Sequence, residues 1–214
     1  METKQRPVPG QNFPDPLDEG LDKRAPGSYL CSFNFPLPDH LTSSIDYESI
    51  LKIRQVGTIE RSQTLQELPQ DDEPYTKKFP INLEFVNRLN LPLFDWVTSS
   101  FDSLGVPSEG RPLVLAHAPN QVIMHRDNGM FAVILLPLRG VSFGTLWFAD
   151  NDRQLVLKTK LVAGRAYLLN VSQFHGLWLP PGLDFWFVRH CFQQTTYKEV
   201  QQQLASRFAL SYGC

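Results

Sequence analysis

Short apolar segments fill the second half of the chain and alternate with polar turns. The turns are rich in Gly, Asp, Asn and Pro, with Asp127-Asn128-Gly129 and Pro180-Pro181-Gly182 as the clearest. Many short strands joined by frequent turns are typical of a jelly roll or barrel. Residues 28–36 also alternate as a strand does, whereas residues 45–54 fit either a short helix or a strand. We therefore predict a mainly β domain with strands at 113–118, 121–126, 130–138, 145–149, 155–160, 165–170, 176–179 and 184–192.

Two other stretches have helical spacing. Apolar residues recur every three or four positions from residue 80 to 104, which predicts helix that covers one face of a sheet. Pro92 is expected to begin a new helix, because proline is tolerated in a first turn and not inside a helix. Residues 195–210 are predicted to form an amphipathic C-terminal helix behind a cap at Thr195-Thr196.

The domain organisation follows from these patterns. Residues 1–27 are rich in proline and are expected to form an extended arm, which either folds over the site or mediates a homodimer. Residues 28–214 are expected to form a single domain, with the β core at about 110–193. The polar stretch 63–78 is predicted to be a surface loop.

Composition and charge narrow the functional class. The hydrophobic fraction of 42% and aromatic fraction of 12% are those of a globular protein. The net charge is −2, and positions 1–75 hold 13 acidic against 7 basic residues. Phosphate contacts need a basic face, so we do not expect a nucleic-acid substrate. We expect a small molecule or a protein side chain as the substrate.

Cysteine use and hydropathy bear on the compartment. Cys31, Cys191 and Cys214 form no Cys-x-x-Cys pair, which is expected of reduced thiols in a cytoplasmic protein. The first twenty residues do not resemble a signal peptide. The longest apolar run, at 130–138, is far shorter than the roughly 20 residues that a helix needs to cross a bilayer. No membrane association is therefore expected.

Candidate metal chemistry begins at His125 and Asp127. Side chains two residues apart on a strand point to the same side, so an imidazole and a carboxylate at this spacing can bind one metal ion together. His175 is the candidate third ligand, and two histidines with one carboxylate form the non-haem Fe(II) arrangement that leaves coordination positions open. Arg189 lies inside an apolar strand, where a buried guanidinium needs an anion. A carboxylate ligand would pair with it through two hydrogen bonds.

The order of these residues resembles a known family. A His-x-Asp motif, a histidine 50 residues after the first and an arginine 14 residues later are similar to the pattern of the Fe(II)- and 2-oxoglutarate-dependent oxygenases. Their fold is a double-stranded β-helix, and the resemblance covers roughly residues 110–193. The similarity is greatest to the small hydroxylases, such as the proline and aspartyl/asparaginyl hydroxylase-like enzymes.

The resemblance implies an activity and roles for four residues. His125, Asp127 and His175 would hold Fe(II), with 2-oxoglutarate as co-substrate on two open positions and O2 on the third. Arg189 would bind the distal carboxylate of 2-oxoglutarate. The implied reaction is a dioxygenase reaction that hydroxylates or demethylates the substrate with release of succinate and CO2. Asp127 stands where related halogenases have a small residue, so halogenation is not expected.

Other positions follow the family less closely. His117 lies on the strand before His-x-Asp, where family members often place a polar residue that contacts 2-oxoglutarate, so it is a further cofactor-binding candidate. His190 should face away from the cavity, because it follows Arg189 on the same strand. Cys191 stands where many members have the Ser or Thr that shares the distal carboxylate. Trp147 and Arg165 lie on predicted strands that can line the cavity.

Two alternatives remain open from the sequence. One is a cupin-like metal-binding jelly roll that works without 2-oxoglutarate, and the other is a non-catalytic jelly-roll binding module. Each candidate also has an ordinary structural interpretation. His125 and Asp127 can be an exposed polar pair before a turn, His175 can be a core or surface histidine, and Arg189 can pair with Asp184 or with an acidic loop.

Overall fold

The computed structural model describes residues 26–55, 60–61, 84–86, 91–106, 113–118, 122–127, 130–150, 154–180 and 182–212. The predicted arm up to residue 25, the predicted loop at 63–78 and Cys214 lie outside the described residues.

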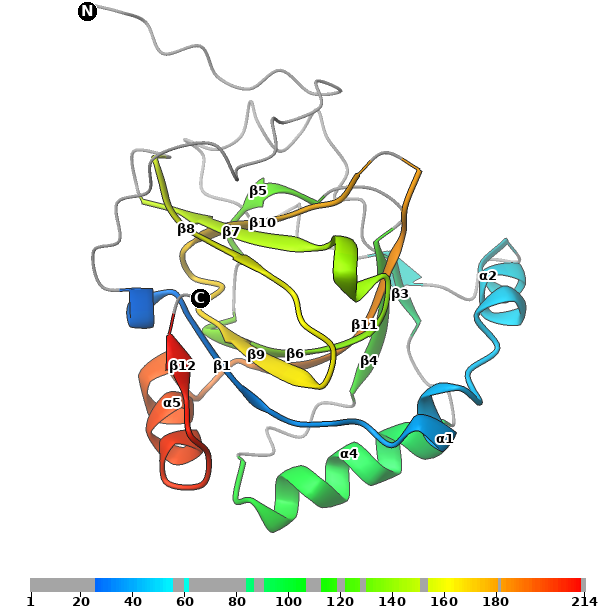
Figure 1. The fold of residues 1–214 in the computed structure, drawn as a ribbon, viewed down its shortest axis with the longest axis horizontal. Coiled ribbons are helices and arrows are strands. Elements are labelled where there is room, and N and C mark those ends of the chain that lie inside the picture. Colours follow the sequence, from blue (N-terminus) through cyan, green and yellow to red (C-terminus); the bar gives the residue numbers. More distant parts are fainter. Residues whose placement is uncertain are drawn as a thin grey trace, which may run out of the picture.

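Two antiparallel sheets form the body of the protein, one facing the other (Figure 1). The smaller sheet has the order β5-β10-β7-β8, formed by Val122–His125, Phe174–Trp178, Thr145–Ala149 and Leu155–Lys160. The larger sheet has the order β12-β1-β9-β6-β11-β4-β3-β2, formed by Ser211–Tyr212, Leu30–Asn34, Arg165–Leu169, Ala132–Arg139, Phe185–Phe192, Val114–Ala118, Glu84–Val86 and Glu60–Arg61.

The chain passes repeatedly from one sheet to the other between β4 and β11. β4, β6, β9 and β11 belong to the larger sheet, whereas β5, β7, β8 and β10 belong to the smaller one. The larger sheet has the order β9-β6-β11-β4 over these strands, and all pairings are antiparallel. This is the topology of a double-stranded β-helix, or jelly roll, so the predicted fold class is confirmed.

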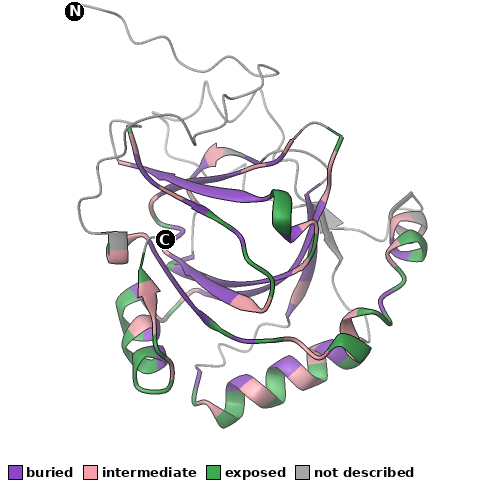
Figure 2. Ribbon diagram, in the orientation of Figure 1, coloured by how far each residue is buried: buried purple, intermediate pink, exposed green. Residues whose placement is uncertain are grey.

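The central strands of the larger sheet are largely buried (Figure 2), and apolar residues pack on both of its faces. On β11, Phe185 and Phe187 face the space between the sheets, and Trp186 and Val188 face outward. The outward side chains pack with helix α4 (Pro92–Ser103) and helix α5 (Tyr197–Ala205). Because helices cover its outer face, the larger sheet is buried on both sides, and the smaller sheet closes the jelly roll over the inner core.

The other helices among the described residues are short. They are α1 (Asp39–Thr42), α2 (Tyr47–Gln55) and the 3₁₀ helices η2 (Pro26–Ser28) and η5 (Val141–Phe143). In the part of the chain that the structure describes, no helix is both long enough and apolar enough to cross a membrane.

Several predicted elements differ from the observed ones. Pro92 begins α4 as predicted, but residues 84–86, predicted to be helical, form β3, because they pair with β4 at the edge of the sheet. α5 begins one residue after its cap, Thr196, and ends at Ala205, before the predicted end. β10 begins at Phe174, two residues earlier than predicted, so it includes His175.

Candidate metal centre

His125 and His175 face each other across two neighbouring strands of the smaller sheet. His125 ends β5, His175 is the second residue of β10, and the two are register partners. Their ring centroids are 4.4 Å apart. The register shifts between this pair and the next, Leu177 with Val122, so β5 contains a bulge just before His125. Bulges are over-represented next to functional sites, where they can change the direction of a side chain.

Asp127 follows β5 and completes a cluster of three buried ligands. Its amide donates a hydrogen bond to the carbonyl of Val171 (3.0 Å), and its Oδ1 lies 3.3 Å from Nε2 of His125. One ligand atom from each of His125, Asp127 and His175 lies within 4.8 Å of the others. The three side chains are therefore close enough to share one ion, and burial shields the site from bulk water.

The tautomer of His175 suits a metal ligand. Its Nδ1 lies 2.9 Å from the carbonyl oxygen of Gln173, and a carbonyl only accepts, so Nδ1 carries the hydrogen. The lone pair is thus on Nε2, the nitrogen left for an ion, as in metal sites whose ligands are oriented by a second hydrogen bond. Burial, and then repulsion by His125, lowers the pKa of His175 to about 3, so the imidazole is neutral near pH 7.

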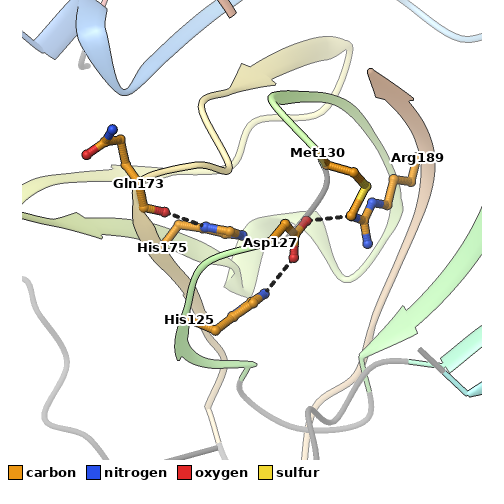
Figure 3. Close-up of polar contacts among 6 residues, drawn as sticks. All are labelled: His125, Asp127, Met130, Gln173, His175 and Arg189. Atoms are coloured by element: carbon orange, nitrogen blue, oxygen red, sulfur yellow. Dashed lines mark hydrogen bonds and ion pairs between the residues drawn. The ribbon is translucent and has the colours of Figure 1, made fainter. Parts of the chain in front are cut away.

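Arg189 pairs directly with the ligand Asp127 (Figure 3). Its Nη2 donates to Oδ2 of Asp127 at 2.6 Å and lies 3.3 Å from the sulfur of Met130. Burial alone would raise the pKa of Asp127, but Arg189 and then His125 outweigh it and hold that pKa well below its usual range. Burial opposes the charge of Arg189 too, yet Cys191 and Asp127 raise the arginine pKa. Asp127 is therefore ionised, with one oxygen toward His125 and the other toward Arg189.

A small cavity of about 50 Å³ adjoins the three ligands and Arg189. A space of this size holds a few water molecules, since one water needs about 10–15 Å³ of such volume. The rest of its wall is apolar, formed by Val122, Val133, Leu135, Leu146, Leu169, Val171, Gly176, Leu177 and Phe187. A ligand larger than a few waters requires these side chains or Arg189 to move.

His117, the further cofactor-binding candidate, is not brought to this cluster. It lies on β4 with its side chain on the outer face of the larger sheet, stacked on Trp186 with ring centroids 4.2 Å apart. Its Nε2 lies 3.2 Å from the carboxylate of Asp184. His190 also faces outward, and its ring contacts Phe101, in agreement with the alternation predicted for β11.

Three other residues can be placed. The indole of Trp147 lies against the backbone of Gly176, and Arg165 donates to the hydroxyl of Ser32, so neither lines the cavity. Cys191 is buried on the inner side of β11, the side of Arg189. Sequence reasoning missed Gln173 and Met130, because a backbone carbonyl and an apolar side chain carry no signal of a metal site.

The geometry of the site is suited to binding a divalent metal ion. Two neutral imidazoles and one ionised carboxylate can hold a divalent ion on one face and leave positions open on the other. His125, Asp127 and His175 fit this requirement in donor type and proximity, and His175 also fits it in tautomer.

The sequence matches no protein-family model and no curated protein. Its structure is similar to solved 2OG-Fe(II) oxygenases, prolyl hydroxylases among them. A prolyl hydroxylase of Trichoplax adhaerens, in complex with a hypoxia inducible factor peptide fragment, is 16% identical with a TM-score of 0.49, over 84% of this chain and 87% of that one. A prolyl-4-hydroxylase of Pseudomonas putida is 13% identical with a TM-score of 0.46, over 79% and 95%. A 2OG-Fe(II) oxygenase of Burkholderia pseudomallei is 10% identical with a TM-score of 0.41, over 77% and 96%.

Proposed function

We propose that the protein is an Fe(II)- and 2-oxoglutarate-dependent dioxygenase that hydroxylates a small molecule or a protein side chain. The observation that carries the proposal is the buried cluster of His125, Asp127 and His175, whose ligand atoms lie within 4.8 Å of one another between the sheets of a jelly roll. This donor set favours Fe(II) with open positions.

The residues of the centre have separate tasks in this proposal. His125, Asp127 and His175 would hold Fe(II), which, when bound, supplies the redox chemistry that couples decarboxylation of 2-oxoglutarate to oxidation of the substrate. The carbonyl of Gln173 fixes His175 in the tautomer that presents Nε2. The apolar side chains around the cavity exclude bulk water, which strengthens the electrostatic interactions inside.

Arg189 is the proposed carboxylate-binding residue for the co-substrate. Its guanidinium is the cation that lines the cavity among the described residues, and it has five N–H donors for planar anions. Its Nη2 donates to Asp127 and lies 3.3 Å from the sulfur of Met130, and the guanidinium also interacts with Cys191. Binding of 2-oxoglutarate therefore requires the guanidinium to share its donors with Asp127 or to turn away from it, which also enlarges the cavity.

The test is an anaerobic titration of metal-free protein with Fe(II) and 2-oxoglutarate. Chelation of the iron by the co-substrate is expected to give a visible charge-transfer band, with succinate released when O2 is admitted. His125→Ala should abolish the band because it removes a ligand. Arg189→Ala should weaken 2-oxoglutarate binding and leave an Fe(II) site.

Arg139→Ala is the matched control, because this arginine lies on the outer side of the jelly roll over the ring of Tyr47. It should leave the band unchanged. The absence of any band in the wild-type protein would overturn the proposed co-substrate.

A second candidate, metal binding without 2-oxoglutarate, is favoured by one observation. The sequence predicts a carboxylate ligand for the buried Arg189, yet Asp127 supplies an anion at 2.6 Å from within the chain. The same titration separates the two functions. Fe(II) binding that depends on His125, with no response to 2-oxoglutarate, would identify the cupin-like alternative.

A further inference from the structure

We infer that Arg126 and Phe174 form a clamp on the outer face of the smaller sheet that positions the metal ligands on its inner face. This inference rests on the proposed metal centre. It assigns to Arg126, the middle residue of His125-Arg126-Asp127, a role of its own as a positioning residue.

The clamp lies directly behind the candidate ligands. Arg126 separates His125 from Asp127, and Phe174 immediately precedes His175. The guanidinium carbon of Arg126 lies 4.0 Å from the ring centroid of Phe174. Phe174 precedes the inward-facing His175 on β10, so alternation turns its ring outward, and its contact with Arg126 joins the two ligand-bearing segments from behind.

The end of β5 needs such an additional contact. β5 has four residues, and its bulge separates the pair of His125 with His175 from the pair of Val122 with Leu177. Beyond His125, the amide of Asp127 bonds to Val171. The ligand-bearing end is therefore the terminus of a short, irregular strand, where backbone pairing alone restrains the side chains least.

β10 is supported from its other neighbour as well. A Cβ atom at Gly176, the residue after His175, would lie 2.3 Å from Nε1 of Trp147 on β7. The indole therefore occupies the space that a larger residue at 176 would fill. Phe174 and Gly176 flank His175, so the ligand lies between two outer-face contacts, one with Arg126 and one with Trp147.

Two effects of Arg126 on metal affinity can be distinguished, because its charge and its positioning of the ligands act in opposite directions. A guanidinium next to two ligands repels a bound cation, so its removal by itself tightens metal binding. Loss of positioning acts in the opposite direction. Weaker metal binding after neutralisation of Arg126 is thus a result that the charge does not explain.

The experiment is a double-mutant cycle on metal affinity with Arg126→Met, Phe174→Leu and the double variant. Metal-free protein is titrated with Co(II), whose visible absorption reports both affinity and ligand geometry. Each single variant is expected to bind Co(II) roughly tenfold or more weakly, as is usual when a residue that orients ligands is lost. The double variant should resemble the singles, because both remove one contact.

Two further variants complete the design. Arg126→Lys keeps a cation that can lie over the ring and should recover part of the affinity and the wild-type spectrum. Arg139→Met removes a comparable contact, 5.5 Å over the ring of Tyr47, and should leave Co(II) binding unchanged. If Arg126 had only a structural role, Arg126→Met would lower the stability of the fold, as Arg139→Met does. The spectrum of the bound Co(II) would then be unaltered.

The outcomes separate the clamp from the centre itself. Unchanged or tighter Co(II) binding by Arg126→Met, with wild-type binding intact, overturns the clamp and leaves the metal centre standing. Additive losses in the double variant also overturn it, because the two residues would then act independently. Failure of the wild-type protein to bind Co(II) overturns the centre and, with it, the clamp.

Discussion

Asp127 contacts both His125 and Arg189, and these two contacts determine how its replacement affects stability. Its carboxylate lies between Nε2 of His125 and Nη2 of Arg189, and all three side chains are buried. The ion pair makes the carboxylate available as an anion at every pH near neutrality. The same ion pair also compensates the buried positive charge of Arg189, which loses this partner when Asp127 is replaced.

Asp127→Ala is therefore expected to destabilise the metal-free protein by about 3–5 kcal/mol, the usual cost of removing one partner of a buried ion pair. Urea unfolding in the presence of a chelator measures this. The double variant Asp127→Leu with Arg189→Met should be closer to wild type than Asp127→Ala, since no buried charge is left without its partner. A double variant as unstable as the single would show that the charge of Arg189 is not the cause.

Gly176 makes a second prediction at the scale of single residues. A Cβ there would lie 2.3 Å from Nε1 of Trp147 and 2.9 Å from the carbonyl oxygen of Val122. Gly176→Ala should lower the free energy of unfolding by about 1–3 kcal/mol, because the strands must separate to make room. Adding Trp147→Phe removes the nearer obstacle and should restore part of the loss in the same urea experiment. No effect of the single variant would show that β7 and β10 shift at little cost.

Helix α5 has a complete capping box, which makes it a test of local structure. The hydroxyl of Thr196 accepts from the amide of Glu199, and the Glu199 carboxylate accepts from the amide of Thr196. Thr196→Ala should destabilise the protein by about 1 kcal/mol in thermal or urea unfolding. Lys198→Ala, in the same turn, leaves the box intact and should stay within about 0.5 kcal/mol of wild type. Equal losses in both variants would contradict the capping role.

The strands of the jelly roll were predictable because short apolar runs between turns have few other structures available. The boundaries of β7 and β8 agree with the prediction to the residue. The start of β10 was missed because Phe174 faces outward and contacts Arg126, so an apolar residue stands where alternation suggests a polar one. β3 was missed because pairing with β4 overrides the helical spacing of residues 84–86.

The candidate ligands were predictable from spacing, but the face of each strand was not. β4 is buried on both faces, so alternation does not reveal that His117 faces outward toward Trp186. The ion-pair partner of Arg189 could not be predicted from the sequence either. Asp127 is 62 residues away in the chain, and only the packing of the two sheets brings the pair together.

At the scale of the whole molecule, the packing of the two sheets buries the charged and titratable groups of the centre. The ligands lie on the inner face of the smaller sheet, opposite β11 of the larger sheet, which carries Arg189. Two imidazoles, a carboxylate and a guanidinium are therefore enclosed between apolar walls. Such an enclosure favours the neutral form of His175, so the stability of the metal-free fold must depend on pH.

The direction of that dependence follows from His175. Its pKa is about 3 in the folded protein, mainly because of burial, against an ordinary value of 6.5. Between these values the unfolded chain binds a proton that the folded protein does not bind, so stability falls as the pH is lowered from about 6.5 toward 3. The depressed pKa of Asp127 acts in the same direction, but only below about pH 5, where the unfolded carboxyl begins to bind a proton.

Urea unfolding of metal-free protein between about pH 7.5 and 5.5 tests this, because the range lies above the one in which Asp127 and Glu199 contribute. The unfolding midpoint of the wild-type protein should fall across this range, and His175→Gln should fall less, since it removes the group that titrates. His40→Gln is the control, because this histidine is exposed on α1 and its loss should leave the slope unchanged. Equal slopes for wild type and His175→Gln would mean that His175 gains a proton without cost, and the enclosure between the sheets would then not be what keeps the ligand neutral.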